Sequence, residues 1–242
     1  MGGLADGVYQ VADCRLHVVS QVWPWAANRR AAIEAHFAQA QAQNPTYFNG
    51  TIHLLRSHSL DNGIFHGSYV RTDFAAFLYW RACGHPVEAG VRDGFGSAIV
   101  TCAGGGVLLG RQRPGNVNAG KAYLPGGFID PRDVNGDGVI DIEAQTAREL
   151  REETGLGAEL CTRRQGFLLS VAGPLVSIGA LHETSLDANA LEAHVRGNLA
   201  AQAEPELADV VCIREVEALS AFDVPAYSAA VVKALLTADG GS

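Results

Sequence analysis

The amino-acid sequence predicts an α/β fold that follows a smaller α+β region. Short apolar runs at residues 97–101 and 107–111 have the length and composition of buried strands. A charged segment at residues 144–154 follows them and has helical spacing. With 242 residues, 48% of them hydrophobic, the chain can bury a large core in one or two domains. We expect an α+β domain at residues 1–90 and a larger domain at residues 91–242.

The first 90 residues contain strands and helices of their own. In order, we expect a strand at 15–22, an alanine-rich helix at 28–43, strands at 51–55 and 64–70, and an apolar helix at 73–82. Asn44-Pro45 ends the first helix, and Asp61-Asn62-Gly63 favours a hairpin between the two strands. The large aromatic side chains are expected in the core rather than at a ligand: Tyr47, Phe48, Phe74, Phe77, Tyr79 and Trp80.

The larger domain continues the alternation of strands and helices. Beyond the helix at 144–154, we expect strands at 165–171 and 174–182, a polar helical stretch at 187–202 that forms an excursion or lid, and a closing helix at 227–236. Asp141 is placed to cap the helix at 144–154, because its side chain can accept from first-turn N–H groups. Gly155 is the expected helix terminator.

The helix at 144–154 carries acidic residues close together. At 100° per residue, Glu149, Glu152 and Glu153 share one face, and Ala147 and Leu150 lie on the side that can pack on a core. Like charges at this spacing destabilise a helix, so a positive group should compensate them. One interpretation is a Mg²⁺ site that acts on a phosphorylated substrate, since Mg²⁺ prefers carboxylate and phosphate oxygens. The other is a solvated helix face on which Arg148 pairs with Glu152.

The residues around this helix resemble a known family signature. Pro125-Gly126-Gly127, followed by Arg148-Glu149-Leu150-Arg151-Glu152-Glu153-Thr154-Gly155-Leu156, is similar to the Nudix box of Nudix hydrolases. The second half matches the pattern, whereas the first half departs from it. The pattern has a glutamate where this chain has Ile140, and the segment between Gly127 and Arg148 is longer than usual. Asp130 and Glu143 are both candidates for the missing acid.

The resemblance implies a fold and a reaction. The fold would be an α/β/α sandwich with a mixed sheet, and the reaction would be Mg²⁺-dependent hydrolysis of a diphosphate linkage, with Mn²⁺ as an alternative ion. It implies these metal ligands: Glu149, Glu152, Glu153 and the carbonyl of Gly127. Arg148 would hold Glu149, and the general base would be Glu149 or Glu206, which aligns with a late acidic position of the family better than Glu204 does.

Three cations precede the box, namely Arg111, Arg113 and Lys121. In the family this region lines the substrate cleft, so they are candidate phosphate-binding residues; a solvated basic loop is an equally good interpretation. We favour a nucleoside diphosphate linked to a sugar or a similar small moiety, with ADP-ribose, UDP-sugars and coenzyme A derivatives open. The segment Asn44 to Gly50 is loosely similar to Nudix proteins that act on sugar nucleotides. The alternative, favoured by the altered first half of the box, is a nucleotide-sensing or metal-binding module with little turnover.

A second motif lies inside the extended box. Asp133, Asn135, Asp137 and Gly138 match the beginning of a calcium-binding loop, so residues 133–143 could hold a structural Ca²⁺ ion. The twelfth position of such a loop requires a bidentate acid, but it is Ala144 here. An Asx/Gly turn explains the same residues, and it is the interpretation that we favour.

Composition excludes several other classes. A formal net charge of −8 disfavours a nucleic-acid-binding surface, so the expected partner is a small nucleotide. The five cysteines form no CxxC pair, which suits reduced thiols in the cytoplasm. The N-terminus lacks the basic and apolar runs of a signal peptide, and no segment is long enough to cross a membrane. A homodimer is compatible with the sequence but is not required by it.

Overall fold

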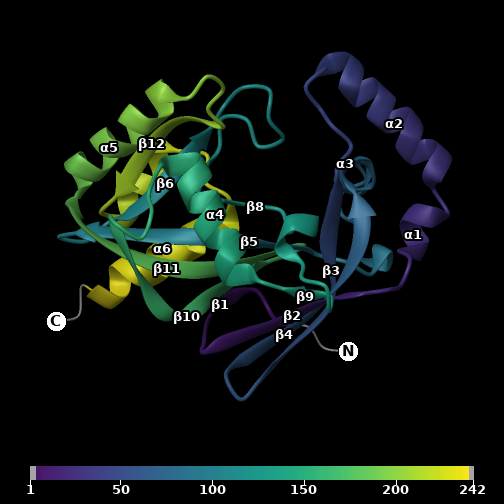
Figure 1. Cartoon of the computed structure of the whole chain (residues 1–242), viewed down its shortest axis with the longest axis horizontal. Coiled ribbons are helices and arrows are strands. Elements are labelled where there is room, and N and C mark those ends of the chain that lie inside the picture. Colours follow the sequence, from purple (N-terminus) through teal and green to yellow (C-terminus); the bar gives the residue numbers. More distant parts are fainter. Residues whose placement is uncertain (1–3, 240–242) are drawn as a thin grey trace.

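The computed structural model describes residues 4–239 and contains two mixed β-sheets (Figure 1). The larger sheet has the order β1 (Gly7–Val11), β10 (Cys161–Ala172), β11 (Leu175–Asp187), β5 (Asp93–Ala103), β6 (Val107–Gln112) and β12 (Leu207–Ile213), with β7 (Ala122–Tyr123) on β6 and β8 (Gly126–Gly127) on β5. The smaller sheet has the order β3 (Thr51–Asp61), β4 (Ile64–Asp73), β2 (Asp13–Val19) and β9 (Val139–Ile140). Each sheet has one parallel pair, β11–β5 and β2–β4, among antiparallel neighbours.

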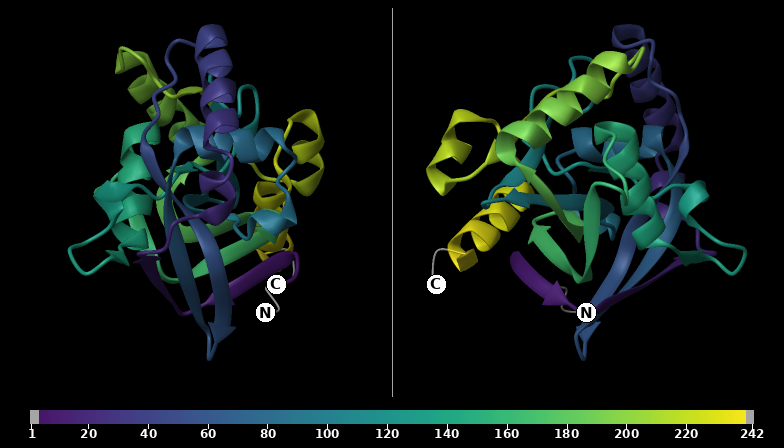
Figure 2. Two further views of the ribbon diagram at one scale, coloured as in Figure 1. Left: turned by 90° about the vertical axis from the view of Figure 1, so that its right-hand side faces the viewer. Right: turned by 60° about the vertical axis from the view of Figure 1, so that its left-hand side comes forward.

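Helices cover both faces of the larger sheet (Figures 1 and 2). One face carries α4 (Ile142–Thr154) and α5 (Ala188–Ala201), and the other carries η3 (Val216–Ala221) and α6 (Ala226–Asp239). Both faces are apolar because side chains alternate along a strand: Ala98 and Val100 of β5 pack towards α4 and α5, whereas Ile99 between them packs towards α6. The predicted α/β/α sandwich with a mixed sheet is confirmed.

The smaller sheet supports a helical layer made of α1 (Pro24–Ala27), α2 (Arg30–Gln43), α3 (Phe74–Ala82) and η1 (Val87–Ala89). Asp73 caps α3 by accepting from Ala76 N at 2.8 Å, and it also pairs with Arg30 of α2 at 2.7 Å. The predicted hairpin is present as β3 and β4. Its turn residues Asn62 and Gly63 have φ angles of 48° and 76°, which suit the right-handed twist of the paired strands.

Each sheet contains one strand from the other region of the chain, and the sequence did not predict this. β1 pairs with β10 in the larger sheet, and β9, from the extended box, pairs with β2 in the smaller sheet. One hydrophobic cluster accordingly joins Leu16 and Phe65 of the smaller sheet to Leu169 and Ile178 of the larger one. Residues 1–90 and 91–242 are therefore interlocked. Their status as separate domains stays a prediction.

Phe128 is a further link between the two regions. It follows β8, and its ring packs edge-on against Phe77 of α3, with 4.8 Å between the ring centroids, and against Phe74 at 6.2 Å. The next residue, Ile129, accepts a hydrogen bond from the backbone N–H of His53 in β3 at 2.9 Å. The segment after β8 is thus fixed on both sides.

Several sequence-based expectations differ from the structure. Residues 187–202 are not a lid, because α5 packs on the sheet through Leu191, Val195 and Leu199. Phe48 is 81% exposed rather than in the core, whereas Trp80 is fully buried as expected. All five cysteines are free thiols.

Two further expectations concern membranes and the N-terminus. Within residues 4–239, no helix has the length and apolarity needed to cross a bilayer. The expectation that the N-terminus is not a signal peptide concerns residues 1–3 in part, and these lie outside the described residues.

We expect Phe128→Ala to lower the free energy of unfolding by about 2 kcal/mol, because Phe128 is partly buried and buried Phe→Ala changes cost about 3 to 5 kcal/mol. Phe48→Ala removes the same ring from an exposed site and should change stability by less than about 0.5 kcal/mol. Urea unfolding followed by tryptophan fluorescence measures both. Equal effects of the two substitutions would show that Phe128 does not join the two regions.

Candidate active site

Helix α4 lies close to the larger sheet, and local sequence sets both of its ends. Asp141 accepts from Ala144 N at 2.9 Å at its start, and Gly155 adopts a left-handed conformation with φ of 75° at its end, as predicted. The close approach requires a glycine on β5, since a Cβ atom at Gly96 would lie 1.8 Å from Gln145 Oε1. The buried face of α4 therefore includes the carboxylates Glu149 and Glu153.

Glu153 is the most deeply buried acid of the helix, with 2% of the residue exposed. Its Oε2 accepts from Gly126 N at 3.0 Å, whereas no hydrogen-bond donor of the described residues meets its Oε1. Burial, together with the charges of Glu206 and Glu149, raises the pKa of Glu153 well above its ordinary value. A carboxylate in this position lacks a partner for one of its oxygens.

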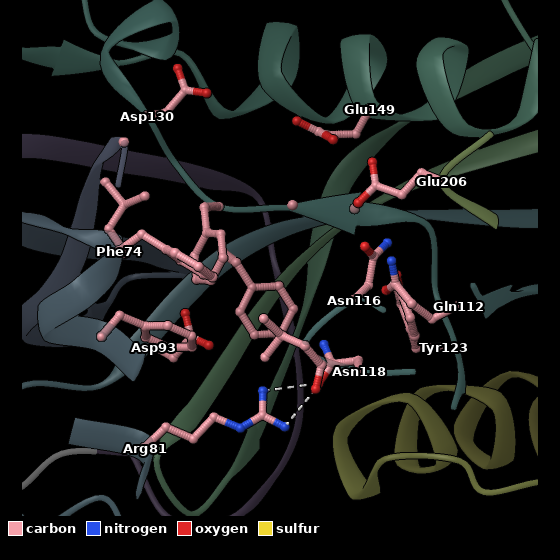
Figure 3. Close-up of a pocket in the computed structure, with 18 of the residues that line it drawn as sticks. Phe74, Arg81, Asp93, Gln112, Asn116, Asn118, Tyr123, Asp130, Glu149 and Glu206 are labelled. Carbon is pink, nitrogen blue, oxygen red and sulfur yellow. Dashed lines mark hydrogen bonds between the residues drawn. The ribbon is translucent and has the colours of Figure 1, made fainter. Parts of the chain in front are cut away.

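Glu149 faces the cleft from the same helix. Burial raises its pKa to about 7, although the nearby Arg148 guanidinium opposes the shift. A Cβ atom on Gly127 would lie 2.8 Å from Glu149 Oε2, so glycine is needed for this approach. Glu206 stands at the solvent-exposed rim before β12, where neighbouring protein atoms displace water and raise its pKa. Figure 3 shows Glu149 and Glu206 on the same side of the cavity.

Glu152 does not share this environment. Its side chain is 54% exposed and lies 3.3 Å from Arg148 Nη1, the contact that the solvated-face interpretation predicts. Arg148 also contacts Glu149 at 2.7 Å and Asp133 at 2.8 Å, and the Asp133 side chain is only 2% exposed. The structure thus brings Glu149 and Glu153 into the interior and leaves Glu152 at its edge.

The donors at this site suit a hard divalent cation. Carboxylate oxygens of Glu149 and Glu153 are crowded and removed from water, and Glu153 Oε1 lacks a donor. The Gly127 carbonyl lines the same region and accepts from Gln145 Nε2 at 3.0 Å. Among residues 4–239, no three His, Cys, Asp or Glu side chains already stand as a ligand cluster around one point.

The loop at 133–143 does not have the arrangement of a calcium site. The Asp133 carboxylate pairs with Arg148 and accepts a hydrogen bond from the backbone N–H of Asp130 at 2.9 Å. Asn135 Oδ1 accepts from the backbone N–H groups of Asp137 and Val139, both at 3.0 Å. These are the hydrogen bonds of an Asx turn, the interpretation that the sequence favoured.

The two candidates for the missing acid of the box, Asp130 and Glu143, lie in different environments. Asp130 lines the cavity and pairs with Arg132 at 2.6 Å, whereas Glu143 pairs with Arg163 of β10 at 3.1 Å. Ile140, which occupies the family's glutamate position, is buried and pairs with Leu16 in the smaller sheet. Of these positions, Asp130 alone belongs to the cavity wall.

A cavity of about 940 Å³ extends from the acidic side to the N-terminal region. Gln112 and Tyr123 lie next to Glu206 on its wall, and the Tyr123 hydroxyl donates to Gln112 Oε1. On the opposite side, Arg81 of α3 donates to Asn118 Oδ1 at 3.1 Å and to the Val117 carbonyl at 3.2 Å (Figure 3). Both regions of the chain therefore build the wall.

Asp93, at the start of β5, also lines the cavity. It is 7% exposed, and its Oδ1 has no hydrogen-bond partner in the described part of the chain. Burial raises the pKa of Asp93 to about 7, and the charge of Arg81 opposes the shift. Sequence reasoning missed Asp93 and Arg81, because an acid at a strand start and an arginine in an apolar helix carry no motif.

The three cations before the box have different positions. Lys121 lines the cavity and lies 3.8 Å from Asp223. Arg111 is exposed, and Arg113 donates to the Pro205 carbonyl at 3.1 Å in a separate surface hollow. The structure thus brings only Lys121 of the three to this wall.

The structure thus combines an α/β/α sandwich with an acidic helix beside a large cavity. Residues 92–235 match the family model of the NUDIX domain. The chain therefore belongs to the Nudix family, and its predicted class, a Nudix-type pyrophosphohydrolase, is confirmed. Members of the family generally use divalent metal ions and act on small nucleotides.

Solved structures of similar fold come from several organisms. A Nudix hydrolase from M. smegmatis, RenU, is 18% identical, with 61% of this chain and 84% of that chain covered and a TM-score of 0.39. The MutT protein from Methanosarcina mazei Go1 is 21% identical, with 62% and 95% covered and a TM-score of 0.40. The Ap4A hydrolase of C. elegans is 18% identical, with 62% and 98% covered and a TM-score of 0.42. No curated protein matches the chain.

We expect Arg148→Met to lower the free energy of unfolding by about 2 to 4 kcal/mol, because it leaves Asp133 buried without its charge partner. Arg151→Met, on the same helix, removes an exposed arginine that lies 3.8 Å from Glu159 and should cost less than about 1 kcal/mol. Chemical denaturation of both variants measures the difference. A comparable small loss for both would contradict a structural role of the Arg148–Asp133 pair.

We expect Asp93→Asn to become more stabilising as the pH rises. Below about pH 4 the carboxyl is protonated in both states; between there and pH 7 only the unfolded chain loses the proton, so the wild-type free energy of unfolding falls. The asparagine variant lacks this loss. The difference in Tm, variant minus wild type, should therefore be larger at pH 8 than at pH 5. A difference independent of pH would show that Asp93 titrates normally.

Proposed function

We propose that the protein hydrolyses the diphosphate linkage of a nucleoside diphosphate joined to a small moiety, such as a sugar nucleotide or ADP-ribose, and releases a nucleoside monophosphate. The observation that carries this proposal is the buried carboxylate of Glu149 on the wall of a cavity of about 940 Å³, with the buried carboxylate of Glu153 four residues further along α4. Two acids removed from water need a cation, and a cavity of this size can hold a nucleotide derivative. We further propose a cytoplasmic enzyme that acts as a monomer or homodimer and requires no nucleic acid or membrane.

In this proposal Glu149, Glu152, Glu153 and the Gly127 carbonyl hold Mg²⁺ or Mn²⁺. When bound, such an ion offsets the charge of the diphosphate and lowers the pKa of a coordinated water. Glu153 is held in place by Gly126 N, and Glu152 is exposed, so its side chain can leave Arg148 to reach a ligand. The hard oxygen donors of this set are those that Mg²⁺ prefers.

The remaining roles follow from position. Arg148 orients Glu149 through their 2.7 Å contact. Glu206 and Glu149 both face the cavity and are the candidate general bases that take the proton of the attacking water. Of the three cations before the box, Lys121 lies on the wall and is the one placed to contact phosphate, whereas Arg111 and Arg113 would have to reach the substrate from outside the cavity. Residues 1–90 supply the wall opposite the acids, where the attached group would lie.

A second candidate function is nucleotide sensing or metal binding with little turnover. The observation in its favour is Ile140, which places a buried side chain in a strand at the position where the family has a glutamate. The loop geometry of the box then differs from that of typical hydrolases. Binding without product would support this candidate.

We expect Glu153→Gln to lower kcat by about 100-fold or more with Mg²⁺ present, because the amide keeps the contact with Gly126 N but loses the charge that holds the ion. Glu159→Gln, an exposed acid just after α4, is the matched control and should retain wild-type activity. The assay follows nucleoside monophosphate release from ADP-ribose, UDP-sugars and coenzyme A derivatives.

Removal of metal by a chelator should abolish product formation, and added Mg²⁺ should restore it. Saturable binding of these nucleotides with no product from any of them would favour the sensing candidate. Wild-type activity in Glu153→Gln would contradict the proposed metal site.

A further inference from the structure

Part of the cavity has aromatic walls. We name it the aromatic chamber and define it by Phe74, Phe77, Phe95, Phe128 and Tyr227, all of which line the cavity. The rings form two groups. Phe77 meets Phe128 edge to face at 4.8 Å between centroids and stacks with Phe74 at 6.2 Å, and Phe95 meets Tyr227 edge to face at 5.0 Å. Such walls suit a flat ring with an apolar face, because base–aromatic stacking stabilises binding and tolerates different bases.

Asp93 is the acidic group that faces this chamber. Figure 3 shows Asp93 and Arg81 on the opposite side of the cavity from Glu149 and Glu206. The backbone N–H of Asp93 donates to the Pro174 carbonyl at 2.8 Å, which fixes the residue at the start of β5. Its side chain is buried with one oxygen unpaired among the described residues. Because Oδ1 is covered by protein atoms, a ligand donor would reach the carboxyl group from the cavity through its other oxygen.

Arg81 does not satisfy Asp93. Its guanidinium donates to Asn118 Oδ1 at 3.1 Å and to the Val117 carbonyl at 3.2 Å. These contacts fix residues 117 and 118 against α3, at the wall of the same cavity. Arg81 thus shapes the wall, and Asp93 lines the cavity without an ion-pair contact to Arg81.

The acceptor character of Asp93 discriminates between flat rings. Adenine, cytosine and guanine each carry an exocyclic amino group whose N–H can donate to a carboxyl oxygen. Uracil offers one ring N–H between two carbonyl oxygens. When the Asp93 carboxyl is ionised, above about pH 7, its oxygens repel these two carbonyl oxygens. Building on the proposed function, we propose that the aromatic chamber binds a nucleobase with an amino group and that Asp93 selects it by accepting its N–H.

The test measures binding of AMP, GMP, CMP and UMP to the full chain with Mg²⁺ by calorimetry at about pH 8.5, where the Asp93 carboxyl is ionised, for the wild type, Asp93→Asn and Asp61→Asn. Asp61 undergoes the same chemical change at the exposed hairpin end of β3 and serves as the control. We expect wild-type protein and the control to bind at least one amino-bearing nucleotide about tenfold or more tightly than UMP, the effect of one good hydrogen bond. In Asp93→Asn the ratio should fall towards one and UMP should bind more tightly, because the amide can donate to a uracil carbonyl.

Four outcomes would overturn the inference. One is wild-type binding of UMP as tight as that of the other three nucleotides, and another is an unchanged ratio in Asp93→Asn. The third is loss of ribose 5-phosphate or glucose 1-phosphate binding in Asp93→Asn without any change in base preference, which would assign Asp93 to a sugar hydroxyl. Absence of binding by all four nucleotides would equally overturn it.

Binding needs no turnover, so this test is separate from that of the proposed function. A protein that selects amino-bearing bases but forms no product would refute the hydrolase and retain the role of Asp93. A protein that hydrolyses adenine and uracil derivatives with equal kcat/KM would support the hydrolase and refute the role of Asp93.

Discussion

The close packing of helix α4 on strands β5 and β8 is the constraint on which the rest of the molecule depends. At Gly96 of β5 a Cβ atom would lie 1.8 Å from Gln145 Oε1, and at Gly127 of β8 it would lie 2.8 Å from Glu149 Oε2, so glycine at both positions lets these side chains of α4 lie against the sheet. That approach carries Glu149 and Glu153 out of water, where their charges are costly without a cation. The packing that stabilises the sandwich therefore also creates a site that favours a bound cation.

The segment inserted into the box has a structural role. The side chain of Arg148 in α4 pairs with Asp133 in the inserted segment, and β9 of that segment adds a strand to the smaller sheet. The insertion thereby ties the acidic helix to the N-terminal region instead of extending into solvent. Because β1 in turn joins the larger sheet, the two walls of the cavity are held by strands and not by loops alone. Groups on opposite walls can then contact one substrate at a set separation.

Sequence-based prediction succeeded where neighbours in the chain decide the structure. The cap at Asp141, the stop at Gly155 and the hairpin turn at Asn62 are local features, and each is present. Prediction failed where burial decides it. The polar stretch expected as an excursion or lid packs on the sheet as α5, and Phe48 lies in solvent although Tyr47 beside it packs against Phe74. Neither result can be inferred from periodicity, since periodicity does not say what a face will contact.

By itself the sequence determined the family and the acidic helix, because the spacing of Glu149, Glu152 and Glu153 is set by the 3.6-residue period of a helix. Only the tertiary structure decided that Glu153 is buried while Glu152 is exposed. It also decided that Asp93, more than fifty residues earlier in the chain, lines the same cavity. The physical reason is that burial and long-range contacts arise from packing between distant segments, which no local pattern of residues encodes.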